Sequence, residues 1–261
     1  DQQLREAPLS ALPLPPIAVI GGGLIGVSWA ALFLAYGRKV HIFEPDTEIR
    51  QHLPARMSLP MQQIKQVRQD LSTPGELVLA NTLEEAVTGV GFIQENAPEK
   101  APLKRAIYAC IEASAPADVI IASSTSSLVW SDLAEGMRAP ARLITAHPFN
   151  PPHLMPLVEI FGTNRAFVLQ AVDFYRGFDR HCVTLKREAV GHIANRLSSA
   201  LWREAVNMVA EGIADVDAID EALVYGPGLR WSVIGAHLAY HLGGGQGVIA
   251  HYLSHLGPSQ E

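Results

Sequence analysis

Short apolar runs separated by amphipathic stretches organise the first two thirds of the chain. The apolar runs predict buried strands at residues 17–20, 40–43, 77–80, 91–94, 118–122, 143–146, 157–158 and 182–185. Between them, apolar positions recur at helical spacing in residues 27–36, 83–87, 101–113 and 166–177. This alternation predicts an α/β fold with a mostly parallel sheet that is wound on both faces.

Residues 46–71 interrupt this alternation. They are mostly polar and helical in tendency, but Pro54 and Pro60 are expected to break or kink a helix there. We therefore predict an excursion across the sheet rather than a core element.

Glycines follow the first predicted strand directly. Gly21, Gly23 and Gly26 form a G-x-G-x-x-G sequence between that strand and the next helix. The first glycine permits a tight turn, the second lets the backbone approach a pyrophosphate, and the third lets helix and strand pack closely. Free N–H groups at the helix N-terminus favour the anion. We predict that these glycines, with Leu24 and Ile25, bind NAD.

An acidic residue, Glu44, ends the second predicted strand. Its carboxylate is placed to accept hydrogen bonds from an adenosine ribose and to repel a 2′-phosphate, so NAD is favoured over NADP. A glycine-rich turn without a ligand is the alternative, which the order of strand, glycines, helix and acid disfavours.

The pattern changes from Ala189 onward, where apolar positions such as Leu197, Leu201, Ala205 and Met208 recur at helical spacing. We predict three regions: an N-terminal tail at residues 1–16, a Rossmann NAD-binding domain at 17–187, and a smaller all-α domain at 188–261 for substrate binding and dimerisation.

Composition narrows the functional classes. The chain has 261 residues, 48% of them hydrophobic, and a formal net charge of -6, which argues against nucleic acid or an anionic membrane as the main partner. No apolar run is long enough to span a membrane, and the first 16 residues lack the pattern of a signal peptide. Cys110 and Cys182 match no metal or redox spacing, so we expect reduced thiols in a cytoplasmic protein.

One imidazole and one carboxylate close two successive apolar runs. His147 follows residues 143–146 and Glu159 follows 157–158, with a proline-rich crossing between them. Both side chains are expected near strand ends, where open α/β sheets bind ligands. A carboxylate fixes the tautomer of a neighbouring histidine and stabilises its cation, so the pair can accept a proton near neutral pH. A core histidine capped by a backbone group would give the same pattern.

Two further groups of side chains have competing interpretations. The hydroxyls of residues 123–127 follow a predicted strand, where they could face the ligand crevice, but such residues are also common turn formers and helix caps. His237 with His241, and His251 with His255, are each one helical turn apart, but neither pair has an evident third ligand. We predict no metal site.

Four blocks together resemble the 3-hydroxyacyl-CoA dehydrogenase family, most closely its branch containing carnitine 3-dehydrogenase and gulonate 3-dehydrogenase (lambda-crystallin). They are the glycine sequence, residues 123–127, residues 147–159 and residues 191–196. The resemblance implies that His147 is the general base and that Glu159 orients it. It also implies that Ser126 and Asn195 hold the substrate oxygen.

The same resemblance implies further contacts. Asn150 is expected near the cofactor, and Glu95 and Lys100 match positions that touch the cofactor or its surroundings, although Lys100 could equally be a solvated surface charge. Members of the family usually dimerise through the helical domain, so we expect a homodimer.

Two departures concern the substrate. Acyl-CoA members more often have Asn where this chain has Ser124, and residues 225–231 resemble the carnitine dehydrogenase branch. Arg230 could bind a free carboxylate, and Trp231 with Tyr240 could face a quaternary ammonium, although packing in an interface explains these residues as well. We predict NAD-dependent oxidation of a short L-3-hydroxy acid; the alternatives are a short L-3-hydroxyacyl-CoA as substrate, or a non-catalytic NAD-binding protein.

Overall fold

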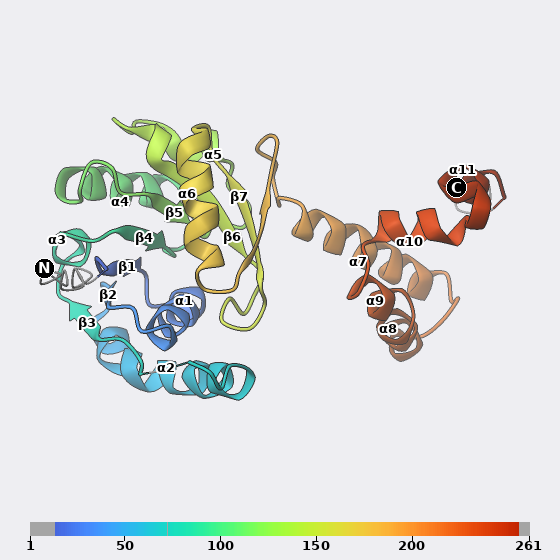
Figure 1. Cartoon of the computed structure of the whole chain (residues 1–261), viewed down its shortest axis with the longest axis horizontal. Coiled ribbons are helices and arrows are strands. Elements are labelled where there is room, and N and C mark those ends of the chain that lie inside the picture. The colour runs from blue at the N-terminus through green and yellow to red at the C-terminus, as the bar shows by residue number, and fades with distance from the viewer. Residues whose placement is uncertain (1–13, 72, 256–261) are drawn as a thin grey trace, which may run out of the picture. The chain divides into compact units, whose positions relative to one another are not determined.

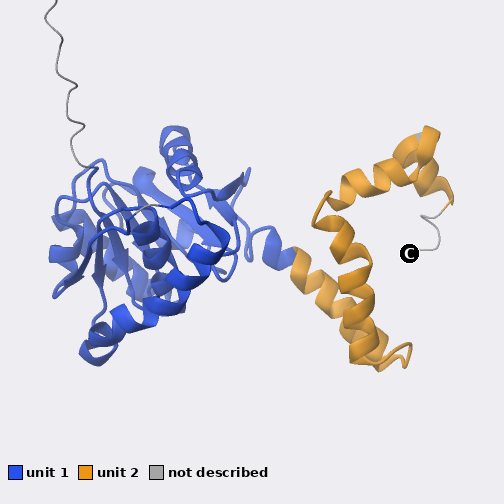
Figure 2. Cartoon of the chain, turned by 60° about the horizontal axis from the view of Figure 1, so that its bottom comes forward, with its two compact units in different colours: residues 1–196 blue, residues 197–261 orange. Residues whose placement is uncertain are grey.

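The computed structural model describes residues 14–71 and 73–255. The chain divides into two compact units, residues 1–196 and 197–261 (Figure 2). The first unit is an α/β sandwich and the second is helical, which confirms the predicted fold class. The division lies nine residues beyond the predicted boundary at 187, because residues 188–196 pack with the first unit.

A single sheet with the strand order β3-β2-β1-β4-β5-β6-β7-β8 forms the centre of the first unit (Figure 1). Its strands are β1 (Ile17–Ile20), β2 (Val40–Phe43), β3 (Leu77–Ala80), β4 (Phe92–Glu95), β5 (Ile121–Ser123), β6 (Leu143–Pro148), β7 (Leu157–Phe161) and β8 (His181–Thr184). Neighbouring strands are parallel except β6 and β7, which pair antiparallel. The exception follows from the short connection at residues 149–156, which is too short for a helical crossover.

Helices cover both faces of the sheet. They are α1 (Leu24–Ala35), α2 (Thr47–Val67), α3 (Leu83–Val87), α4 (Ala101–Ser114), α5 (Trp130–Ala134) and α6 (Arg165–Arg176). One apolar cluster joins α1, α2 and α6 to the sheet, with Trp29 and Tyr175 fully buried. A second cluster joins α3, α4 and α5 to the other face, with Tyr108 fully buried. The sheet therefore presents its strand ends, not its faces, to a ligand.

The segment expected to be an excursion across the sheet is helical, as its tendency predicts. Helix α2 runs through Pro54 and Pro60, so neither proline ends it. Its side chains Leu53, Met57 and Ile64 are buried in the first apolar cluster. Packing on the sheet therefore outweighs the local cost of the two prolines, and the helix is a core element.

Helix α7 (Ala194–Ala210) begins in the first unit and continues into the second. The second unit also contains α8 (Val216–Tyr225), α9 (Pro227–Trp231), α10 (Ala236–Gly243) and α11 (Val248–His255). In the described chain, α7, α8, α9 and α11 have no buried residue. No described helix is long and apolar enough to cross a membrane.

Candidate active site

The glycine turn between β1 and α1 has the geometry that the sequence predicts. Gly21 has a φ of +94°, and a Cβ atom built on Gly26 would lie 1.8 Å from the carbonyl oxygen of Gly21. A Cβ atom on Gly23 would meet nothing within 4 Å. The backbone at the start of α1 therefore faces open space, and side chains are excluded from the tight part of the turn. This cradle fits the pyrophosphate of a dinucleotide.

Glu44 lies directly after β2 and beside the glycine turn. Its two carboxylate oxygens accept hydrogen bonds from the backbone N–H of Gly22 at 2.7 Å and of Asp46 at 3.1 Å. The side chain is only partly buried. Glu44 thus holds the glycine turn from the side on which a ribose contact is expected.

The antiparallel pairing of β6 and β7 sets His147 directly opposite Glu159. The Nδ1 atom of His147 lies 2.8 Å from the Oε2 atom of Glu159, and both side chains are buried. His147 is next to the end of its strand as expected, whereas Glu159 is in the middle of β7. A backbone cap for His147, the alternative interpretation, is not what the structure shows.

The second oxygen of Glu159 lies at the N-terminus of α7. Its Oε1 atom accepts hydrogen bonds from the N–H of Ile193 at 2.8 Å and of Ala194 at 2.9 Å. Burial raises the pKa of Glu159, but the hydrogen bonds from His147, Ala194 and Ile193 outweigh burial and hold this pKa below its usual value. An ionised carboxylate only accepts hydrogen bonds, so Nδ1 of His147 carries a proton, and the neutral form of the ring has its lone pair on Nε2.

A second imidazole, His192, stacks on His147. The ring centroids are 4.8 Å apart, and Nε2–H of His192 donates to the carbonyl oxygen of Thr125 at 3.1 Å. His192 is buried, and burial lowers its pKa, followed by the charge of His147. Sequence reasoning gave this residue no role. The turn before α7 therefore contacts the base, its carboxylate and the hydroxyl-rich segment at once.

That hydroxyl-rich segment, residues 123–127, wraps around Glu99. The Oε1 atom of Glu99 accepts hydrogen bonds from the hydroxyl of Thr125 at 2.7 Å and from the N–H groups of Ser126 and Ser127 at 2.8 Å. The amide of Asn195 donates to the carbonyl of Ser126 at 3.4 Å. Ser126 and Asn195 are thus neighbours, as their expected shared role requires. Thr125 accepts from Leu128 N–H, so the turn-forming interpretation holds for that residue.

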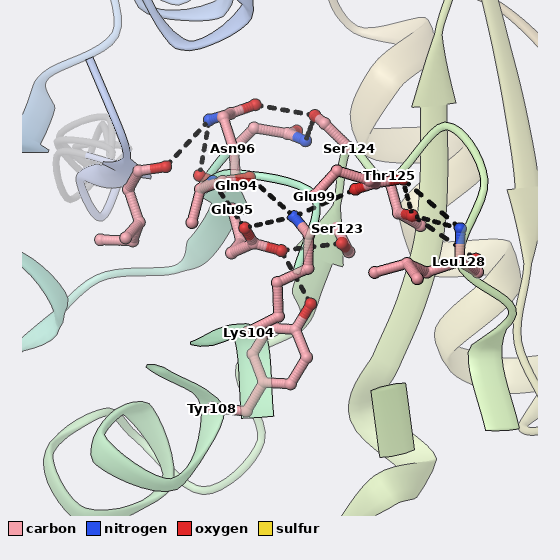
Figure 3. A network of polar contacts seen from close by, with 12 residues as sticks. Gln94, Glu95, Asn96, Glu99, Lys104, Tyr108, Ser123, Ser124, Thr125 and Leu128 are labelled. Carbon is pink, nitrogen blue, oxygen red and sulfur yellow. Dashed lines mark hydrogen bonds and ion pairs between the residues drawn. The ribbon is translucent and has the colours of Figure 1, made fainter. Parts of the chain in front are cut away.

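Glu95, expected to contact the cofactor or its surroundings, is fully buried. Figure 3 shows it within a network of polar contacts with Lys104, Tyr108 and Ser123. Its oxygens accept from Lys104 Nζ at 2.8 Å, Tyr108 OH at 2.7 Å, Ser123 Oγ at 2.7 Å and Ala97 N–H at 2.6 Å. The protein supplies all four of these donors, and Glu95 has no exposed surface, so a role of Glu95 toward the cofactor stays a prediction. Glu95 holds the ends of β4 and β5 together.

Lys104, which sequence reasoning missed, is the buried cation of this network. Lys100, the lysine predicted to lie near the cofactor, is exposed at the N-terminal cap of α4. Lys104 lies one helical turn further on and is buried against Glu95. The one signal available in the sequence was its position on the same face of the helix as Tyr108.

A cavity of about 490 Å³ joins these features. Of the predicted residues, Ile25, Ser126, His147, Asn150 and Asn195 line it. The rest of the lining consists of Asn96, Ala97, Glu99, Lys104, Ser124, Pro148 and Phe149. The cavity thus extends from the start of α1 to the base, which is the arrangement needed to bring a cofactor and a hydroxyl group together.

The residues that the sequence predicts for the carboxylate and the ammonium of the substrate belong to the second unit. Arg230 and Trp231 are in α9 and Tyr240 is in α10. Arg230 is exposed there, whereas Trp231 and Tyr240 are partly buried, and the ring of Tyr240 lies 5.0 Å from that of Tyr252.

Known proteins match the chain over most of its length. Residues 16–189 match the model of the 3-hydroxyacyl-CoA dehydrogenase NAD binding domain, and residues 191–260 match that of the C-terminal domain. The chain is 43% identical to L-carnitine dehydrogenase of Nocardiopsis dassonvillei, with 93% of this chain and 75% of that protein covered. It is 44% identical to L-carnitine dehydrogenase of Streptomyces coelicolor, with 93% and 78% covered.

Among solved structures, the chain is similar to a 5-formyl-3-hydroxy-2-methylpyridine 4-carboxylic acid 5-dehydrogenase, an NAD+ dependent dismutase. The TM-score is 0.84 at 27% identity, with 94% of this chain and 81% of that chain covered. The 3-hydroxybutyryl-CoA dehydrogenase of Escherichia coli K12 shares the fold, with a TM-score of 0.72 at 24% identity and 81% and 46% covered.

Proposed function

Because the chain belongs to the 3-hydroxyacyl-CoA dehydrogenase family, we propose that it oxidises the 3-hydroxyl of a short, carnitine-like L-3-hydroxy acid to the 3-oxo acid. Membership makes it an NAD-dependent oxidoreductase that acts on a CH–OH group. The observation that carries the proposal is the His147–Glu159 pair beside a cavity that reaches Ile25 at the start of α1.

His147 is the general base. Its Nδ1–H is held by Glu159, so the lone pair on Nε2 is the group that takes the hydroxyl proton. The negative charge of Glu159 stabilises the imidazolium that forms, and the N-terminus of α7 keeps that carboxylate ionised and in place. The buried ring of His192 fixes the plane of His147.

Ser126 and Asn195 hold the reacting oxygen. Both line the cavity beside His147, and both carry donors that a hydroxyl oxygen can accept from. As the carbon–oxygen bond gains double-bond character, such fixed donors steady the charge on the oxygen. Glu99 holds the backbone on both sides of Ser126, so this donor keeps its position without substrate.

NAD, when bound, supplies the acceptor for the hydride that leaves the substrate carbon. The open backbone at Gly23 and the N-terminus of α1, with the neighbouring Leu24 and Ile25, fit its pyrophosphate, and Glu44 fits an adenosine ribose. We assign Asn150, which lines the same cavity, to the reactive end of the cofactor.

The substrate proposal follows the relatives named L-carnitine dehydrogenase. A carnitine-like acid carries a carboxylate and a quaternary ammonium on either side of the reacting carbon. We assign the carboxylate to Arg230, because a guanidinium binds carboxylates bidentately. We assign Trp231 and Tyr240 to the ammonium, because aromatic faces attract cations.

A second copy of the chain is the expected protein partner, bound through the helical unit. Leu197, Trp202 and Leu229 on this unit are 67%, 71% and 60% exposed, which is unusual for large apolar side chains in a lone subunit. The homodimer would cover them. We place the enzyme in the cytoplasm, because the thiols of Cys110 and Cys182 are free.

A substrate panel tests the proposed function. Purified protein and NAD are mixed with L-carnitine, L-gulonate, free L-3-hydroxybutyrate or L-3-hydroxybutyryl-CoA, and NADH formation is followed. Turnover of a free acid, with L-carnitine the best, supports the proposal. Turnover of the thioester alone would return the chain to the acyl-CoA branch, and no turnover despite tight NAD binding would favour a non-catalytic role.

A further inference from the structure

The connection between β6 and β7, residues 149–156, forms part of the cavity wall but lies outside the strands of the sheet. It carries Phe149 and Asn150, which both line the cavity. The buried residues of the connection are Pro152 and His153. The place of Asn150 therefore depends on how the buried part of this short segment is anchored.

Both ring nitrogens of His153 contact helices that cover the sheet. Nε2 lies 2.8 Å from Oε1 of Gln63 on α2, and Nδ1 lies 2.7 Å from the hydroxyl oxygen of Ser28 on α1. The same hydroxyl oxygen accepts the backbone N–H of His153 at 2.9 Å. Ser28 is 2% exposed and His153 is 7% exposed, so water competes little for these hydrogen bonds. Two of the three contacts tie the connection to α1, the helix that begins at the glycine turn.

The imidazole of His153 makes these contacts in its neutral form. Burial lowers its pKa, followed by the charge of Arg180. The amide oxygen of Gln63 only accepts, so Nε2 carries the proton and Nδ1 has the lone pair. The hydroxyl of Ser28 thus donates to the ring and accepts from the backbone of the same residue. These reciprocal hydrogen bonds fix the main chain and the side chain of His153 together.

Arg180, which precedes β8, holds the backbone of the same connection. Its guanidinium donates to the carbonyl oxygens of Pro152 at 2.8 Å and of Met155 at 3.2 Å. In the part of the chain that the structure describes, no protein group is hydrogen-bonded to the side chain of Asn150. The position of Asn150 is therefore set by the anchor at His153, three residues further along the connection.

We propose that His153 is a positioning residue, which through its hydrogen bonds with Ser28 holds Asn150 in register with the helix that binds the cofactor. This inference rests on the proposed function, in which Asn150 serves the reactive end of NAD. The glycine turn and Glu44 are expected to bind the adenosine half without help from the connection. His153 should therefore affect where the nicotinamide lies more than how tightly the dinucleotide binds.

The test compares wild type with four variants of the full chain. His153→Leu removes both ring contacts, whereas His153→Asn keeps an acceptor close to the position of Nδ1. Ser28→Ala removes the partner on α1. His181→Asn is the matched control, because His181 is an exposed histidine whose backbone N–H bonds the same connection, at Pro156 O. Urea unfolding establishes a temperature at which every variant is folded.

Two quantities are measured: kcat with L-carnitine at saturating NAD, and the nicotinamide fluorescence of NADH titrated into each protein without substrate. His153→Leu and Ser28→Ala should lower kcat by at least about tenfold, because a misplacement of about 1 Å can cost up to about 10²-fold. Their NADH affinity should stay within about threefold of wild type, while the emission of bound NADH moves toward that of free NADH. His153→Asn and His181→Asn should keep the wild-type kcat, affinity and emission. A purely structural role would change only the free energy of unfolding.

Three results would overturn the inference. Wild-type kcat and NADH emission in His153→Leu would show that the connection needs no anchor at this residue. Equal losses in His153→Asn and His153→Leu would show that the contact with Ser28 does not act through Nδ1. Weaker NADH binding with unchanged kcat would assign His153 to cofactor affinity rather than to Asn150. A wild type that does not oxidise L-carnitine would refute the proposed substrate, whereas the NADH emission of the variants would still decide the role of His153.

Discussion

Glu159→Gln is the substitution that probes the base most sharply, because the carboxylate accepts hydrogen bonds on both of its oxygens and an amide can accept on one only. Oε1 of Glu159 faces two backbone N–H groups, from Ile193 and Ala194, which cannot rotate away. Oε2 faces Nδ1 of His147. The amide oxygen of glutamine must therefore take the backbone side, and its NH₂ group is left facing the imidazole.

An NH₂ group that faces Nδ1 changes the tautomer of His147. Nδ1 must then accept, which moves the ring proton to Nε2 and removes the lone pair that takes the substrate proton. A base held in the wrong tautomer loses about 10³- to 10⁴-fold in kcat. The fold is affected less, by about 1–2 kcal/mol, since each hydrogen bond keeps a partner.

Glu159→Ala separates this effect from simple loss of charge. Alanine frees the imidazole to adopt either tautomer, so we expect a loss of about 10² in kcat, smaller than in the glutamine variant. It also leaves two backbone N–H groups without their acceptor and the buried pair without its anion, at a cost of about 3–5 kcal/mol. We predict that kcat falls in the order wild type, Glu159→Ala, Glu159→Gln. The free energy of unfolding should fall in the order wild type, Glu159→Gln, Glu159→Ala.

The assay is initial NADH formation at saturating substrate, with the free energy of unfolding measured by urea for each variant. A glutamine variant within tenfold of wild type would refute the tautomer argument. An alanine variant less active than glutamine would do the same, provided that both proteins are folded at the assay temperature.

Three further predictions concern the cofactor and the buried charges. Glu44→Ala should weaken NAD binding by about tenfold, because a charge-assisted hydrogen bond is lost. Calorimetric titration measures the affinity. The control Glu48→Ala, at the start of α2, should leave the affinity unchanged. Lys104→Met should lower the free energy of unfolding by about 3–5 kcal/mol, because buried Glu95 loses its cation. Lys100→Met, at an exposed position, should change this free energy by less than about 0.5 kcal/mol. Similar changes for the two lysines would contradict a buried Lys104–Glu95 ion pair. The pKa of Glu99 is lowered from 4.5 to about 2, so its contribution to stability is complete above pH 4.5 and is lost as the pH falls toward 2. In thermal unfolding, wild type should therefore lose more stability than Glu99→Gln across this pH range. Equal losses of stability in the two proteins would contradict the lowered pKa.

Sequence reasoning identified the parts of the site that depend on local order. Gly21, Gly23 and Gly26 could be placed between a strand and a helix because close packing and open backbone follow from their spacing alone. His147 and Glu159 could be predicted as neighbours because each closes an apolar run. Their direct opposition could not, because it depends on the antiparallel register of β6 and β7.

The residues that were missed act through contacts between distant segments. Lys104, Glu99 and His192 have no motif of their own. Lys104 contacts Glu95, and Glu99 and His192 contact Thr125, across 9 to 67 residues of chain. The burial of Glu95 could not be predicted from its position in the sequence. Glu95 matches a cofactor position in the family resemblance, but four protein donors surround its carboxylate. Pro54 and Pro60 suggested that residues 46–71 lie outside the core. Helix α2 is nevertheless part of the core, because its packing on the sheet outweighs the local effect of the two prolines.

The central claim is that His147 takes a proton from the hydroxyl of a carnitine-like acid while NAD is reduced. Its most direct test measures NADH formation from NAD and L-carnitine by wild type and His147→Gln side by side, with NAD affinity determined for both proteins. The account predicts that His147→Gln loses at least about 10²-fold in kcat and binds NAD within about twofold of wild type. Near-normal turnover by His147→Gln would contradict the account.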